Sequence, residues 1–222
     1  MNQYDNLSDY YFKLFKKRIK FIKGTNSIIL NFLKNKKIRS CLDIGSADGS
    51  RVKLFSCRLL DTNFSLLEPS KNLFKKIKIM SKDNLKKKNL KFENFKSKKK
   101  FDLILCTWNT LSHIKNLDKF FFTANKFLRK KKFLIFDINN RLNIREYSLI
   151  EVIKNLLFKR YIFTKKINGY ELRSRFYDEN EIINLFQKYN FTVISKFYVD
   201  YKNGRKTTKY KGQILFLLQK KN

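Results

Sequence analysis

The 222-residue sequence has few of the residues that build metal sites, disulfide frameworks or membrane spans. It contains 1 histidine and 3 cysteines, and no two of Cys41, Cys57 and Cys106 have metal-ligand spacing, so we expect reduced thiols and no metal. No apolar run approaches the roughly 20 residues that cross a bilayer. The N-terminus also lacks the order of a secretory signal. These absences predict a soluble cytoplasmic protein without a membrane partner.

Acidic residues are also scarce: 18 Asp and Glu stand against 51 Lys and Arg, which gives a net charge of +33. Such an excess can indicate a nucleic-acid partner. Here, however, lysine is spread over the whole chain, and proline (1) and glycine (6) are rare. This even spread favours a general compositional drift, so a nucleic-acid partner is possible but less favoured than a small molecule.

The centre of the chain alternates short apolar runs with helical stretches. The expected strands are Ser40–Ile44, Asn63–Glu68, Leu90–Asn94, Phe101–Cys106 and Lys132–Asp137. Residues 69–80 and 116–130 have helical character, as do residues 8–23 and a second N-terminal helix capped by Asn26 or Ser27. Near-continuous apolar strands separated by helices predict an α/β fold with a parallel sheet covered on both faces.

The last third has a different pattern. Residues 160–177 alternate around Asn168-Gly169, which predicts a β-hairpin. A helix should follow with Asp178 as its cap, and then two strands around an Asn203-Gly204 turn. We therefore expect a closing pair of antiparallel strands on the parallel sheet.

The stretch SCLDIGSADGSR, residues 40–51, places two glycines directly after a strand that ends in an aspartate. Ligands of open parallel sheets bind beyond the carboxyl ends of the strands, and glycine lets the backbone turn tightly there. The dinucleotide pattern G-x-G-x-x-G fits poorly, because Ala47 and Ser50 would take its second and third positions. The stretch instead resembles the D-x-G-x-G-x-G loop of class I S-adenosylmethionine-dependent methyltransferases, with Ala47 in place of the middle glycine.

The resemblance continues at the next strand. Glu68 ends it, where one carboxylate can accept hydrogen bonds from both hydroxyls of a ribose, and Pro69-Ser70 begins the next helix. The resemblance implies S-adenosylmethionine as the cofactor, with Glu93 or Asn94 at the adenine and Cys106 and Thr107 lining the site. The implied cofactor-binding residues are Asp43, Gly45, Ser46, Ala47, Gly49, Glu68, Pro69, Glu93, Asn94, Cys106 and Thr107.

The same resemblance implies a Rossmann-like, seven-stranded, mostly parallel sheet with an antiparallel last strand. No repeat or linker divides the chain, so we expect one methyltransferase domain over residues 1–222. Its parts would be a helical cap or lid (1–35), the cofactor-binding core (36–140), a helix and hairpin inserted over the cleft (141–177) and a closing helix with antiparallel strands (178–222).

The chemistry implied is an in-line displacement, for which the protein aligns the nucleophile and excludes water. His113 could deprotonate an acceptor, or it could be a hydrogen-bonded structural residue. Arg173 and Arg175 share a face of one strand and could hold an anion, although an outward orientation is slightly favoured. The candidate acceptor-binding residues are Tyr11, Trp108, Asn139, Arg141, Arg173 and Arg175.

Three functions follow from these patterns. The first is a methyltransferase that acts on a small molecule at oxygen, nitrogen or carbon. The second is a tRNA or rRNA methyltransferase, which the basic charge supports. The third is a cofactor-binding homologue that has lost catalysis, for which Ala47 is the only support. The sequence leaves the oligomeric state open.

Overall fold

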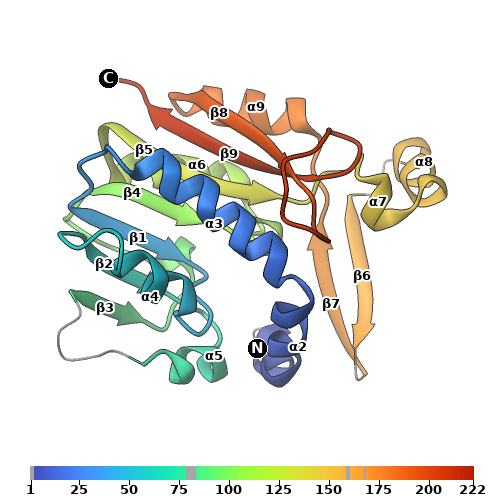
Figure 1. Cartoon of the computed structure of the whole chain (residues 1–222), viewed down its shortest axis with the longest axis horizontal. Coiled ribbons are helices and arrows are strands. Elements are labelled where there is room, and N and C mark those ends of the chain that lie inside the picture. The colour runs from blue at the N-terminus through green and yellow to red at the C-terminus, as the bar shows by residue number, and fades with distance from the viewer. Residues whose placement is uncertain (1–2, 79–83, 159–160, 168) are drawn as a thin grey trace.

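A seven-stranded sheet forms the centre of the computed structural model (Figure 1). The structure describes residues 3–78, 84–158, 161–167 and 169–222. The strand order is β3-β2-β1-β4-β5-β9-β8, and β9 runs antiparallel to both of its neighbours. This topology confirms the predicted Rossmann-like sheet with an antiparallel last strand. The strands are β1 (Ser40–Ile44), β2 (Asn63–Leu67), β3 (Leu85–Lys88), β4 (Phe101–Cys106), β5 (Leu128–Ile138), β8 (Phe191–Val199) and β9 (Gln213–Lys220).

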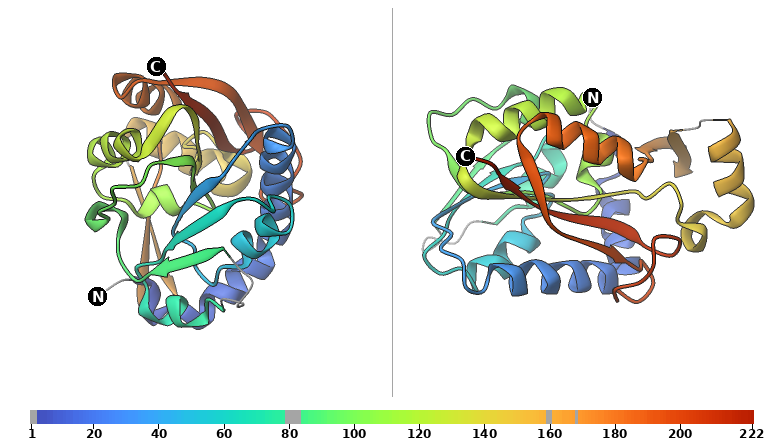
Figure 2. Two further views of the ribbon diagram at one scale, coloured as in Figure 1. Left: turned by 90° about the vertical axis from the view of Figure 1, so that its left-hand side faces the viewer. Right: turned by 90° about the horizontal axis from the view of Figure 1, so that it is seen from above.

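Helices cover both faces of the sheet (Figure 2). One face packs against α3 (Ile19–Leu33), α4 (Ser50–Ser56) and α5 (Lys71–Lys76), and the other against α6 (Leu117–Phe127) and α9 (Glu179–Lys188). Side chains of β4 alternate between these two cores: Leu103 and Leu105 point to the first, Ile104 and Cys106 to the second. Every residue of β4 is buried, which explains its continuous apolar run.

The third strand lies at β3, not at Leu90–Asn94 as predicted. Residues Phe92–Asn94 instead form a 3-10 helix, η1, because Phe92 is buried against α6, with its ring 5.3 Å from that of Phe120. The true strand reads LKKK and lies at the edge of the sheet, where lysine is tolerated and discourages pairing with other chains. An apolar pattern could not reveal such a strand.

The N-terminal helices also differ from the prediction. They are α1 (Gln3–Asn6), α2 (Ser8–Lys17) and α3, and α3 continues through Asn26 and Ser27, so neither residue is a cap. Asn26 is buried because it shares one face of α3 with Ile22, Ile29 and Leu33.

A close backbone approach fixes α3 to the loop after β8. A Cβ at Gly24 would lie 1.9 Å from the carbonyl oxygen of Gly204, and a Cβ at Gly204 would lie 2.0 Å from that of Lys20. Only glycine allows this contact. It brings the loop that carries Tyr201 to the carboxyl ends of the central strands.

The segment between β5 and α9 contains α7 (Ile144–Tyr147), α8 (Leu149–Leu157) and the antiparallel pair β6 (Ile162–Ile167) and β7 (Tyr170–Arg175). The predicted hairpin is therefore confirmed; Gly169 has a φ of +80°, whereas Asn168 lies outside the described residues. Asp178 caps α9 as predicted, since its Oδ1 accepts from the backbone N–H groups of Asn180 and Glu181. Within the described ranges, no helix is both long and apolar enough to cross a membrane.

Candidate functional site

The loop after β1 is bound to the end of β2. The backbone N–H groups of Gly45 and Ser46 both donate to the carbonyl of Leu67, at 2.8 and 3.0 Å. Gly45 and Gly49 have φ angles of +68° and +80°, in the left-handed region. A Cβ at Gly45 would lie 2.4 Å from Cγ2 of Thr110, so glycine is required at this position.

Glu68 lies against this loop, as predicted. Its Oε2 accepts from the backbone N–H of Ala47 and its Oε1 from that of Ser70, both at 2.8 Å. The side chain is buried, and this desolvation raises its pKa to about 7 although both hydrogen bonds favour the carboxylate. Pro69 is half-buried, and Ser70 is the N-cap of α5. The structure therefore brings Glu68 and the glycine-containing loop to one edge.

Arg51 is a residue of this edge that the sequence interpretation missed. Only 1% of it is exposed, and its guanidinium donates to the Asp43 carboxylate and to the Thr107 hydroxyl. It also lies 4.9 Å from the centre of the Trp108 ring. Burial raises the pKa of Asp43, and the Arg51 charge opposes this rise. The sequence could have indicated that Arg51 is buried, because it lies one helical turn before the buried Phe55, on the same face of α4.

The turn after β4 is strained and is held by Asp137. The backbone N–H groups of Trp108 and Asn109 donate to the two oxygens of Asp137, at 2.8 and 2.6 Å. Burial raises the pKa of Asp137 to about 6. Six non-glycine residues have positive φ within the described ranges, and Ala47, Trp108 and Asn109 are three of them. Such strain concentrates at functional sites.

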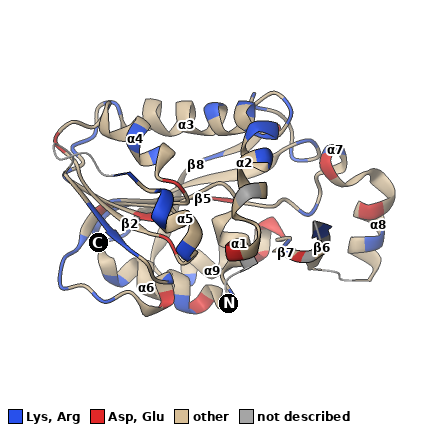
Figure 3. Cartoon of the chain, turned by 90° about the horizontal axis from the view of Figure 1, so that it is seen from below, with Lys and Arg blue, Asp and Glu red and all other residues tan. Residues whose placement is uncertain are grey.

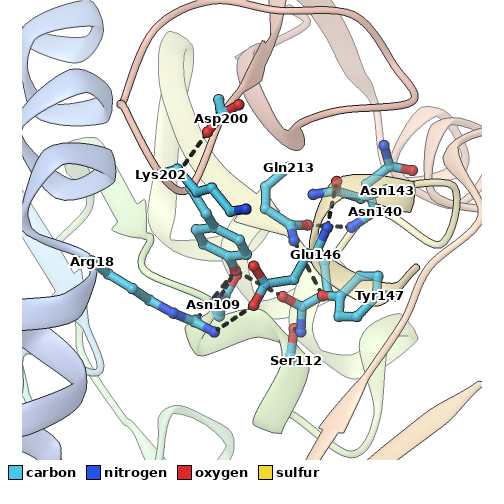
Figure 4. A network of polar contacts seen from close by, with 12 residues as sticks. Arg18, Asn109, Ser112, Asn140, Asn143, Glu146, Tyr147, Asp200, Lys202 and Gln213 are labelled. Carbon is cyan, nitrogen blue, oxygen red and sulfur yellow. Dashed lines mark hydrogen bonds and ion pairs between the residues drawn. The ribbon is translucent and has the colours of Figure 1, made fainter.

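A polar network continues from this turn toward the insertion (Figure 4). Tyr201 lies in it: its hydroxyl accepts from Asn109 Nδ2 and donates to Asn139 Oδ1 at 3.1 Å. Asn139 Nδ2 donates in turn to the Ser112 hydroxyl at 3.0 Å. Arg18, from the junction of α2 and α3, donates to Tyr201 at 3.3 Å and to Glu146 at 3.5 Å. Neither Arg18 nor Tyr201 belongs to a sequence motif, so the sequence interpretation could not identify them.

The N-terminal segment lies across the same edge. Tyr4 donates from its hydroxyl to His113 Nε2 at 2.8 Å. His113 Nδ1 must carry the proton, because it donates to the carbonyl of Arg173 at 3.1 Å. Burial lowers the pKa of His113 to about 4, so the ring is neutral near pH 7. Tyr11 packs edge-on to Tyr4, with ring centres 6.4 Å apart.

A second contact joins the N-terminal segment to the loop that carries Glu68. The Asp5 carboxylate accepts from the Ser70 hydroxyl at 2.9 Å, and the Asp5 carbonyl accepts from Asn72 Nδ2 at 2.7 Å. The segment is therefore bonded on both sides of the edge, to the start of α5 and to the 3-10 helix η2 (Thr110–His113).

The predicted arginines have partners of their own. Arg141 donates to the carbonyls of Asn155 and Leu156 at the end of α8. Arg173 is exposed and pairs with Glu171 at 2.8 Å, in agreement with an outward orientation. Arg175 donates to the carbonyl of Lys115 at 2.9 Å. Their roles in acceptor binding stay predictions.

The remaining cofactor candidates lie at the carboxyl end of β4 and in η1. Cys106 and Thr107 are buried at its carboxyl end. Glu93 is half-buried and Asn94 is exposed, and both are in η1. Burial raises the pKa of the Cys106 thiol, and the Asp137 carboxylate adds to this rise. The contact of Glu93 with adenine stays a prediction.

A family model described as "Methyltransferase domain" matches residues 15–196. The uncharacterized protein MJ1252 of Methanocaldococcus jannaschii is 28% identical over 209 residues, which cover 87% of this chain and 76% of that protein.

Solved structures also have this fold. A S-adenosylmethionine-dependent methyltransferase from Clostridium acetobutylicum gives a TM-score of 0.67 at 18% identity and covers 100% of both chains. A putative S-adenosylmethionine-dependent methyltransferase from Listeria monocytogenes gives a TM-score of 0.73 at 12% identity and covers 90% of this chain and 100% of that chain. A possible histamine N-methyltransferase from Thermotoga maritima gives a TM-score of 0.67 at 17% identity and covers 99% of this chain and 98% of that chain. At these identities the likeness shows the fold alone.

Proposed function

Because the chain belongs to the methyltransferase domain family, we propose that it transfers a methyl group from S-adenosylmethionine to a small-molecule acceptor. Membership of the family confirms the predicted enzyme class, and with it the predicted cofactor. When bound, S-adenosylmethionine supplies a methyl group that its sulfonium already activates for in-line displacement.

The residues at the strand ends fit this cofactor. Among the described residues, the buried polar atoms without a hydrogen-bond partner include Asp43 Oδ2, Arg51 Nε and Trp108 Nε1, and Arg51 contacts both Asp43 and Trp108. Such atoms suit a polar ligand. Each oxygen of Glu68 accepts one backbone N–H and keeps a second lone pair for a ribose hydroxyl. The glycine loop would hold the amino-acid part of the cofactor.

The single observation that supports a small acceptor is the double attachment of the N-terminal segment. Tyr4 bonds to His113 on one side of the edge, and Asp5 bonds to Ser70 on the other. A segment bonded in this way covers the strand ends and excludes water, whereas a polymer needs an open groove. The Thermotoga maritima neighbour, named as a possible histamine N-methyltransferase, gives further support.

The Tyr4–His113 pair would position the acceptor. The Tyr4 hydroxyl donates to Nε2 of the neutral His113 ring at 2.8 Å, which fixes both side chains at the strand ends, where the acceptor would bind. Asn109 Oδ1, which is buried and has no partner among the described residues, offers an atom to accept a hydrogen bond from an acceptor hydroxyl or amine.

An RNA acceptor is the second candidate, and the net charge of +33 favours it. The basic residues are spread over many elements, as Figure 3 shows, and do not form one stripe. Charge of this kind promotes general binding to polyanions without selecting a site.

Calorimetry tests cofactor binding first. Glu68→Gln should weaken S-adenosylmethionine binding roughly thirtyfold, because a charged acceptor of two hydroxyls contributes about 2 kcal/mol. Glu171→Gln, which changes an exposed carboxylate of β7, is the matched control and should leave the affinity unchanged. Equal affinity of the wild type and Glu68→Gln would contradict the site.

Methyl transfer then separates the two acceptors. Tritiated S-adenosylmethionine would be incubated with the enzyme and either a low-molecular-mass cell extract or total RNA, at physiological salt. Label in small molecules supports the proposal. Label in RNA alone would contradict the proposal and favour an RNA methyltransferase. If the protein binds S-adenosylmethionine but labels neither fraction, it is better described as a non-catalytic homologue.

A further inference from the structure

The segment between β5 and β7 exposes an unusual amount of apolar surface. Fifteen large hydrophobic residues are exposed within the described ranges, and nine of them lie between residues 149 and 163. We call these nine the insertion patch: Leu149, Ile150, Ile153, Leu156, Leu157, Phe158, Tyr161, Ile162 and Phe163. Leu157 is 72% exposed and Phe158 67%. Large exposed apolar residues concentrated in one segment are typical of an interaction site.

The patch is held by a rigid attachment. In α8 only Val152 and Asn155 are buried. The buried Arg141 donates to the carbonyls of Asn155 and Leu156 and so fixes the end of the helix. Within the described ranges, the other residues of α8 are all exposed, and Figures 1 and 2 show the helix at one end of the molecule, away from the sheet. Its apolar face therefore points outward in a fixed orientation.

The charge around the patch identifies the partner. Residues 149–166 read LIEVIKNLLFKRYIFTKK, with five basic residues and one acidic residue; Lys154 pairs with Glu151 at 3.7 Å, and Lys159 and Arg160 lie outside the described residues, so they count here by sequence alone. A second copy of the chain would bring the same basic sequence and another net charge of +33 to the interface, which opposes self-association. An anionic bilayer offers apolar and negatively charged groups together, and amphipathic helices with lysine beside exposed Leu and Phe bind such surfaces.

We propose that the insertion patch docks on the surface of an anionic lipid bilayer. The side chains of Leu157 and Phe158 enter the boundary between headgroups and acyl chains, and the neighbouring lysines pair with lipid phosphates. This proposal departs from the sequence-based expectation of no membrane partner. That expectation rests on the lack of a spanning segment, which a helix lying on the surface does not need.

Vesicle flotation tests the proposal with the full chain. The wild type should float with vesicles of equal parts phosphatidylglycerol and phosphatidylcholine, and far less with phosphatidylcholine alone. Leu157→Asp and Phe158→Asp should each lower the partition coefficient about tenfold, since each replaces an apolar side chain that enters the bilayer by a charge. Leu60→Asp is the matched control: Leu60 is 78% exposed, lies far from the patch in sequence, and should bind as the wild type does.

Three results would overturn the proposal. The wild type could fail to float with anionic vesicles. All variants could float equally, which would mean that general basicity alone drives binding. Light scattering could show a wild-type dimer that Leu157→Asp converts to a monomer, and a second copy would then be the occupant. Unchanged S-adenosylmethionine binding by Leu157→Asp shows that the variant is folded and keeps this result separate from the test of the enzymatic function.

Discussion

The ends of β1 and β2 and the insertion after β5 are built in opposite ways. At the strand ends, polar groups are buried and bonded over short sequence distances: Asp43 and Arg51 are 8 residues apart, and Ala47 and Glu68 are 21. In the insertion, apolar groups are exposed, and two of the contacts that attach it to the rest of the fold join distant residues: Tyr147 and Gln213 are 66 residues apart, and Arg18 and Glu146 are 128. Because the contacts at the strand ends are local, a short sequence motif encodes them, whereas these contacts of the insertion form only when the whole chain has folded.

The difference predicts where each region is sensitive to mutation. A buried ion pair is costly to break because the remaining charge has no partner and no water. An exposed pair in the hairpin loses little, since water replaces the missing partner. Variants in the two regions should therefore differ in the size of their effect on stability.

The largest effect is expected for Arg51→Met. This change keeps most of the side-chain volume but leaves the buried Asp43 carboxylate unpaired, so the free energy of unfolding should fall by about 3–5 kcal/mol. Arg173→Met breaks the exposed pair with Glu171 and should cost less than about 1 kcal/mol. Urea denaturation of both variants measures the contrast. Similar losses would mean that the two ion pairs do not differ as proposed.

Cofactor binding should also depend on pH. The folded protein raises the pKa of Glu68 to about 7, and ribose hydroxyls donate to the carboxylate and not to the acid. Affinity for S-adenosylmethionine should therefore fall as pH falls through 7, by roughly tenfold between pH 7.5 and 5.5. Calorimetry at several pH values measures this, and the profile of Glu68→Gln should be flat over the same range.

Without the cofactor, Glu68 should affect folding in the opposite direction. Its folded pKa lies above its ordinary value of 4.5, so its contribution to stability is full below pH 4.5 and is lost as pH rises through about 7. The difference between wild type and Glu68→Gln in unfolding free energy should change by about 3 kcal/mol over this range. A difference that does not depend on pH would show that Glu68 keeps an ordinary pKa.

The same contrast explains which parts could be predicted from sequence. The β1 loop and Glu68 were found because strand, turn and carboxylate follow one another along the chain. Arg51 was missed although its place one turn before Phe55 marked it as buried. The edge strand β3 was misplaced because its lysines carry no apolar pattern.

The rest of the site required the fold itself. Tyr201 reaches Asn109 and Asn139 only because Gly24 and Gly204 let α3 and the loop after β8 approach closely. The Arg141 guanidinium likewise binds the end of α8, whereas its role at the acceptor stays a prediction. No local pattern encodes either outcome, since both depend on residues brought together from distant segments.

The smallest effect concerns Ala47, the one departure from the glycine pattern of the loop. Its φ of +50° is unfavourable for alanine by about 1 kcal/mol, and glycine removes that strain at the expense of a more flexible unfolded chain. Ala47→Gly should therefore stabilise the protein slightly, by less than about 1 kcal/mol, and retain cofactor affinity because its backbone N–H still donates to Glu68. Ala124→Gly, inside α6, should destabilise by at least about 1 kcal/mol. Thermal denaturation compares the two, and destabilisation by both would mean that the loop does not hold Ala47 in a left-handed conformation.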